Sequence, residues 1–148
     1  MKAKAAKLRL LAQDTDGLAI IAAVCQDALF VPKEISYLKN ARRFTVALQR
    51  FCHEIETKHP HGSRIWSLLS FDGVLNVKAK NIPRFGNVPK SILDIKFEVG
   101  DHKPNGTIII TLAESGEIAL SVECVDLTLA DIGEARLAIR APNHEIGE

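Results

Sequence analysis

The chain has 148 residues, which fits one domain with a sizeable core, and its 47% hydrophobic and 25% charged residues are typical of a soluble globular protein. No apolar run approaches the roughly 20 residues of a membrane-spanning helix, and the basic N-terminus lacks the apolar stretch of a secretory signal. Three cysteines without close spacing argue against a disulfide framework, so we expect a cytoplasmic protein with no membrane association.

The first predicted elements are a short strand over residues 7–12 and a helix that follows it. Asp14, Thr15 and Asp16 supply N-cap oxygens and negative charge for the first helical turn. The residues that recur at helical spacing along one apolar stripe are Leu18, Ile21, Ala22, Cys25 and Leu29. We therefore expect this helix to lie across the apolar face of a sheet.

Extended segments separated by turns follow the helix. They are predicted over residues 29–38, 43–54, 64–71, 74–80 and 91–99. Pro32 interrupts the first segment, which suits an edge strand or a bulge. Arg50 falls on the apolar side of its strand, an exception to the pattern. In the last segment the predicted inward residues are Leu93, Ile95, Phe97 and Val99.

The clearest pattern is a hairpin over residues 107–124, in which both arms alternate in period two. Gly116 is expected to supply the positive φ angle of the turn, and Cys124 to be the last inward residue. A final strand is predicted over residues 125–129, ending near residues 131–133. Asp126 would continue the inward parity unless the strand bulges there.

One helix near the start, followed by seven or eight strands joined mostly by short turns, predicts an α+β fold. Short connections favour antiparallel neighbours, so we expect the helix to pack on a curved, mostly antiparallel sheet or a partly closed barrel. Residues 1–133 would form a single domain. Residues 134–148 lack an apolar pattern and are expected to be a partly mobile C-terminal tail.

Four long segments of the sequence carry a resemblance to a known family. They are LRLLAQDTDGLAIIAAVCQDAL, YLKNARRFTVALQRF, LSFDGVLNVKAKNI and TIIITLAESGEIALSVECVDLTLADIG. In this order they resemble the DUF2948 proteins, a proteobacterial family of unknown function, from about Leu8 to Gly133. One departure is Cys52-His53, where that family tends to have Arg-Trp. The resemblance implies a small bacterial cytoplasmic protein and assigns no activity to any residue.

The cysteines and histidines do not form a recognisable reactive group. Cys25, Cys52 and Cys124 are each predicted on an inward face, where a thiol acts as a small hydrophobe with a raised pKa. The histidines near Cys52 in the sequence are His53, His59 and His61. His53 points to the opposite face of the strand from Cys52, and the other two lie in a loop. We therefore predict no metal site, and no phosphate loop or dinucleotide motif indicates a cofactor.

The small net charge conceals an asymmetry along the chain. Residues 1–64 carry 11 Lys and Arg against 6 Asp and Glu, residues 65–106 carry 6 against 4, and residues 107–148 carry 2 against 8. Either basic and acidic strands pair within one sheet, or the surface has one basic and one acidic side. We favour pairing within the sheet.

The candidate binding residues are Arg42, Arg43, Arg50, Lys78, Lys80 and Asp126. Arg50 and Asp126 both have inward parity, so they could form a structural ion pair, which we favour, or a catalytic site with Arg43 or Asp72 nearby. The basic side chains could bind phosphate, RNA or an acidic protein surface. A pI near 7.8 and aromatic residues placed in strands argue against nucleic acid.

We therefore predict a non-catalytic binding or adaptor domain whose partner is an unknown protein or a small anionic ligand. Such a domain could form a homodimer through a sheet edge or through its opposed charges. The alternatives are a small enzyme with a site near Arg50 and Asp126, and a weak RNA-binding protein that uses a basic face.

Overall fold

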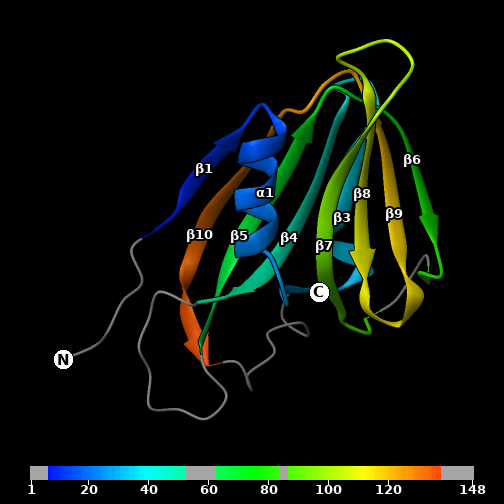
Figure 1. The fold of residues 1–148 in the computed structure, drawn as a ribbon. Coiled ribbons are helices and arrows are strands. Elements are labelled where there is room, and N and C mark those ends of the chain that lie inside the picture. The colour runs from blue at the N-terminus through cyan, green and yellow to red at the C-terminus, as the bar shows by residue number, and fades with distance from the viewer. Residues whose placement is uncertain (1–6, 53–62, 84–86, 138–148) are drawn as a thin grey trace.

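The computed structural model describes residues 7–52, 63–83 and 87–137, which form one α-helix, ten strands and two 3-10 turns (Figure 1). The helix α1 spans Thr15–Val24, and the turns η1 and η2 span Pro32–Glu34 and Ala113–Ser115. The strands are β1 (Arg9–Ala12), β2 (Leu29–Phe30), β3 (Ile35–Leu38), β4 (Arg43–Phe51), β5 (Ser63–Asp72), β6 (Val74–Lys80), β7 (Lys90–Val99), β8 (Gly106–Leu112), β9 (Glu117–Val122) and β10 (Leu127–Leu137).

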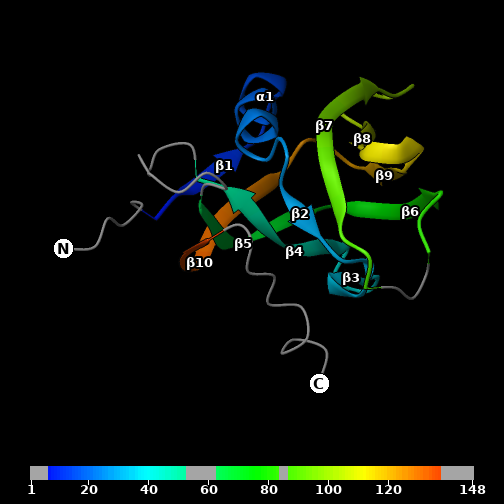
Figure 2. The ribbon, with the colours of Figure 1, turned by 90° about the horizontal axis from the view of Figure 1, so that it is seen from below.

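The strands form one antiparallel sheet with the order β1-β10-β5-β4-β2-β7-β8-β9-β6, and β3 pairs with β4 beside β2. The sheet curls around the core, and Figure 2 shows α1 between β1 and β7 on one side and β3 next to β6 on the other. The predicted helix on an antiparallel sheet is confirmed. The sheet is not closed, because among the described strands β6 pairs only with β9 and β3 only with β4.

The predicted number of seven or eight strands is wrong. The turn η1 begins at Pro32 and divides the segment 29–38 into two strands, β2 and β3. The last strand is also longer than predicted, since β10 pairs with both β1 and β5 and continues to Leu137. Residues 138–148 of the predicted tail lie outside the described residues.

The helix α1 begins as the sequence predicts. The Asp14 side chain accepts a hydrogen bond from the Gly17 amide at 2.8 Å, and Asp16 places negative charge in the first turn. The helix buries Leu18, Ile21 and Ala22 and packs against β1 and β7. A side chain at Gly17 would meet the Cβ of Ala12 at 3.0 Å, so glycine permits the close approach of α1 to β1.

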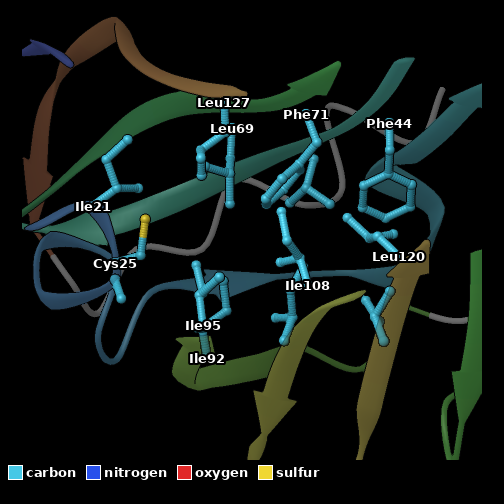
Figure 3. Packing of buried hydrophobic residues seen from close by; sticks show 14 of the residues in the cluster. Ile21, Cys25, Phe44, Leu69, Phe71, Ile92, Ile95, Ile108, Leu120 and Leu127 are labelled. Carbon is cyan, nitrogen blue, oxygen red and sulfur yellow. The ribbon is translucent and has the colours of Figure 1, made fainter. Parts of the chain in front are cut away.

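The core lies between the two halves of the curled sheet (Figure 3). Figure 3 labels Phe44, Leu69, Phe71 and Leu127 from the half with β4, β5 and β10, Ile92, Ile95, Ile108 and Leu120 from the other half, and Ile21 and Cys25 from the helical segment. Each of these side chains is at most 3% exposed. Burial of one such aliphatic or aromatic side chain contributes about 1.5–3 kcal/mol, so these contacts hold the two halves together.

The predicted alternation of β7 is correct only in part. Ile95 is buried, but Leu93 and Val99 are 45% and 58% exposed. Leu93 is exposed because the strand has a bulge at this point. Ile92 pairs with Leu112 and Asp94 pairs with the adjacent Thr111, so Leu93 is the extra residue. Val99 lies at the strand end opposite Gly106, which has no side chain to cover it.

The central hairpin is confirmed, with every inward residue of β8 and β9 at most 1% exposed. The prediction for its turn is wrong. Gly116 has a φ of −79°, and the positive φ angles belong to Glu114 and Ser115. Cys124 is half-buried and not a core residue, because the chain leaves β9 at Val122 and pairs again only from Leu127.

Candidate functional site

The basic residues predicted as candidates occupy three separate places. Arg42 and Arg43 lie at the corner where β5 turns into β6, Arg50 lies in the core, and Lys78 and Lys80 lie on β6. They do not form one basic patch. Each place therefore has to be considered by its own contacts.

Two surface ion pairs occupy the corner. Arg42 pairs with Glu123, and the Nε of Arg43 donates to Oδ1 of Asp72 at 2.8 Å. These side chains are 34% to 58% exposed, so each pair contributes about 0.2–1 kcal/mol. The Arg42 pair joins the basic first part of the sequence to its acidic last part, through two residues that lie just outside the strands.

Arg50 forms a buried bidentate ion pair with Asp131. Its Nε donates to Oδ1 and its Nη2 to Oδ2, both at 2.8 Å, and both side chains are at most 1% exposed. Oδ1 also accepts from the Ser67 hydroxyl at 2.6 Å, and Oδ2 from the Leu8 amide at 2.8 Å. Both carboxylate oxygens are thus engaged inside the sheet, which is typical of a structural pair.

The pKa of Asp131 reflects two opposing effects. Burial raises the pKa, because it disfavours the charged form, and the hydrogen bonds from Arg50, the Leu8 amide and Ser67 lower it. The hydrogen bonds prevail, so the pKa lies below its ordinary value and the carboxylate stays ionised next to Arg50.

The predicted pairing of Arg50 with Asp126 is wrong. Asp126 lies at the corner, where its carbonyl accepts a hydrogen bond from the Asp72 amide at 2.9 Å. Asp126 precedes Asp131 by five residues, about 16 Å of extended chain. The inward parity changes between β9 and β10, so that Leu127, Leu129 and Asp131 face the core. This alternation within residues 127–131 was the sequence signal for the carboxylate partner.

Cys25 and Cys52 lack the surroundings of a nucleophile. Burial raises the pKa of Cys25 to about 12, and the opposing effect of Arg50 is smaller. Cys52 is 2% exposed, in agreement with its predicted inward position. A thiol that stays protonated in an apolar core is a packing residue.

Within residues 7–52, 63–83 and 87–137, no group of three or more His, Cys, Asp or Glu side chains could hold a metal ion. His53, His59 and His61 lie outside the described residues, so the absence of a metal site around them stays a prediction. No helix in the described part of the chain is long and apolar enough to cross a membrane.

One open side of the sheet, between β3 and β6, is covered by no described element, and we call it the seam (Figure 2). At one end the two strands meet, where the Tyr37 hydroxyl donates to the Val74 carbonyl and the Val74 amide donates to the Arg42 carbonyl, both at 2.9 Å. Beyond this contact the seam holds a cleft of about 430 Å³. The side chains that line it are Pro32, Ile35, Val77, Ala79, Ile82 and Pro83. All of these side chains are apolar, and the cleft has a strand edge on either side, where backbone polar groups also line it.

Lys78 and Lys80 lie beside this cleft, on the outer face of β6. Their partners across the β6–β9 ladder are Ala119 and Glu117, whereas the cleft residues Val77 and Ala79 face the buried Leu120 and Ile118. Lys78 and Lys80 are both exposed, and neither forms an ion pair with any described residue. A short strand with alternating lysines, together with Pro32 opposite, was the sequence signal for a sheet edge.

Two other hollows lie elsewhere on the molecule. The one between α1 and β7 has about 460 Å³ and is the space left where small alanine side chains of the helix face the strand. The other, of about 340 Å³, is lined in part by Tyr37 and Val74 and includes Lys39 and Arg42. The helix covers the first opening of the sheet, whereas no described element covers the seam.

Comparison with known proteins identifies a matching family model. The family model described as "Protein of unknown function (DUF2948)" matches residues 8–144, nearly the whole chain. No curated protein and no solved structure matches the chain.

Proposed function

Because the chain belongs to the DUF2948 family, whose function is unknown, we propose a function from the geometry of the seam. The protein is a non-catalytic binding domain that accepts an extended segment of another polypeptide between β3 and β6. The observation that carries this proposal is the cleft of about 430 Å³, lined by apolar side chains, between two strand edges that have no strand partner in the described chain.

Extended peptides bind to sheet edges because the edge offers unpaired backbone N–H and C=O groups. An apolar wall beside the edge adds pockets for alternate side chains of the peptide. The seam has both features, with the edge of β6 and the side chains of Ile35 and Val77 on facing walls. Ile35, Val77 and Ile82 also pack against the core, so the floor of the cleft is held in place.

The contacts of the charged residues support binding over catalysis. The guanidinium of Arg50 is engaged in the core with Asp131, and the acid proposed beside it, Asp126, lies at the other end of β5. A basic face for RNA is also disfavoured, because Arg42 and Arg43 are both paired with carboxylates. These contacts favour the polypeptide-binding proposal over both alternatives.

Selection of peptides from a random phage-displayed library against the purified protein tests the proposal. We expect enriched peptides that bind the wild-type protein and lose at least about tenfold affinity when Ala79→Glu places a charge in the cleft. Ala79 is exposed, so the variant should fold, which thermal melting verifies. Leu93→Glu, at an exposed apolar residue on β7, is the matched control and should leave the affinity unchanged.

Chemical-shift mapping of one selected peptide on the ¹⁵N-labelled protein provides a second measurement. The shifts should be concentrated in β3 and β6. Failure to enrich any peptide, or peptides whose binding tolerates Ala79→Glu as well as it tolerates Leu93→Glu, would contradict the proposal.

A further inference from the structure

We propose that the segment bound in the seam pairs with the free edge of β6 and alternates apolar and acidic residues. This inference rests on the proposed function and specifies its partner: an extended polypeptide whose apolar side chains enter the cleft while its carboxylates lie beside Lys78 and Lys80. It follows from the lengths of the two edges, from the two faces of β6 and from the charges around the seam.

β6 is the better edge for strand addition. It has seven residues, and its hydrogen bonds across the seam to other described residues are confined to Val74 at one end. β3 has four residues and follows Pro32, which has no N–H to donate. The free part of β6, residues 76–80, extends over about 17 Å, close to the length of an average strand.

The two faces of β6 determine the pattern of the added strand. Successive side chains of a strand point to opposite faces, and residues opposite each other on neighbouring strands share a face. An added strand would therefore place every second side chain next to Val77 and Ala79, in the apolar cleft. The side chains between them would lie on the outer face with Lys78 and Lys80.

Acidic residues suit these outer positions because the exposed charges nearby are mainly basic. Lys33 in η1 and Lys39 after β3 are exposed on the other side of the seam, where Glu34 is the nearest carboxylate in the sequence. Lys80 already faces Glu117 across the ladder, whereas Lys78 faces Ala119. Lys78 should therefore contribute more than Lys80 to the recognition of a carboxylate.

The same lysines disfavour a second copy of the chain as the occupant. If two β6 edges paired in antiparallel fashion, Lys78 and Lys80 of one copy would lie next to the same residues of the other. Like charges placed opposite each other destabilise a strand pair, and edge lysines are a common means of preventing such pairing. A partner with carboxylates removes this repulsion.

Synthetic nine-residue peptides with blocked ends test the inference by fluorescence anisotropy. One alternates valine with glutamate, the second valine with glutamine, and the third valine with lysine. We expect the glutamate peptide to bind about 3- to 10-fold more tightly than the glutamine peptide, as two exposed ion pairs would provide. The lysine peptide should bind most weakly. Added salt should reduce the differences.

Substitution of the lysines assigns the preference to β6. Lys78→Gln should remove most of the advantage of the glutamate peptide and leave the glutamine peptide unaffected, while Lys80→Gln should have a smaller effect. Lys96→Gln, at an exposed lysine of β7, is the control and should change neither affinity. Equal binding of the three peptides that Ala79→Glu abolishes would refute the acidic preference and leave the proposed function standing. No binding of any peptide would refute both.

N-methylation of the glutamate peptide tests strand addition itself. An added strand directs alternate amides toward β6, so methylation of one alternate set should abolish binding and methylation of the other set should be tolerated. Equal tolerance of both peptides would show that only side chains are recognised and would overturn pairing with β6.

Discussion

At the scale of single residues, Asp131 connects parts of the chain that are far apart in sequence. Its carboxylate accepts hydrogen bonds from Arg50 on β4, Ser67 on β5 and the Leu8 amide just before β1. Asp131 itself belongs to β10, so one side chain joins four neighbouring segments of the sheet. Buried polar groups of this kind are costly when any partner is removed.

We expect Asp131→Asn to destabilise the protein by about 3–5 kcal/mol, because the substitution leaves the Arg50 charge buried without its counterion. Urea denaturation measures the change in the free energy of unfolding. The matched control is Asp72→Asn, which removes the surface pair with Arg43 and should cost less than about 1 kcal/mol. Equal losses of unfolding free energy in the two variants would contradict this expectation, because they would mean that burying Arg50 without its counterion costs no more than losing a surface ion pair.

The wild-type protein and the Asp131→Asn variant should differ in the pH dependence of their free energy of unfolding. The pKa of folded Asp131 is lowered from its ordinary value of 3.8, so the stabilisation is fully present above the unfolded pKa. The stabilisation decreases as the pH falls through the folded pKa. The difference in unfolding free energy between wild type and Asp131→Asn should thus be constant from about pH 5 to 8 and shrink below about pH 4.

At the scale of elements, Gly73 allows the chain to pass directly from β5 in one half of the sheet to β6 in the other half. It has a φ of +70° and lies between β5 and β6. Its carbonyl accepts a hydrogen bond from the Glu123 amide at 2.9 Å, so the bend is fixed to the adjoining corner segment. The direction in which β6 leaves β5, and hence the position of the seam, depends on this glycine.

We expect Gly73→Ala to reduce stability by about 1–2 kcal/mol, because an alanine at this φ is strained. A clash is not the cause, since the added Cβ would lie 3.4 Å from the Glu123 side chain, an ordinary contact. Gly73→Asn should cost less, because asparagine tolerates the left-handed conformation better. Thermal unfolding of the three proteins gives the comparison, and a loss at least as large for asparagine as for alanine would contradict this explanation.

At the scale of the whole molecule, the two open sides of the curled sheet differ in whether another element covers them. The helix α1 covers the side between β1 and β7, and its stripe of Leu18, Ile21 and Ala22 is buried there. No described element covers the seam between β3 and β6. The sheet therefore combines a buried core with a seam between two strand edges that no described element covers, which is the arrangement that the proposed function requires.

Hydrogen exchange of the free protein should reveal this difference. Amides of β8, which is paired on both sides with β7 and β9, should exchange slowest. The amides of β6 that point toward the seam should exchange at least about 100-fold faster, since they have no strand partner in the described chain. Uniform protection along β6 would show that another part of the chain covers the edge.

The sequence by itself determined most of the local structure. The Asp14 cap, the helical stripe and the period-two alternation of β8 and β9 are encoded within a few residues, because each depends only on local hydrogen bonds and on which face a side chain occupies. The inward position of Arg50 could be predicted for the same reason. The exposure of Leu93 could not, because a bulge depends on the register of the neighbouring strand.

Only the tertiary structure decided which carboxylate meets Arg50 and where the sheet stays open. The break between β9 and β10 changes the inward parity, so Asp131 and not Asp126 reaches the core beside β4 and β5. The seam between β3 and β6 arises from strand order and from the bend at Gly73, which are properties of segments distant in sequence. Local patterns show which face of a strand is apolar, but pairing partners depend on the packing of the whole sheet.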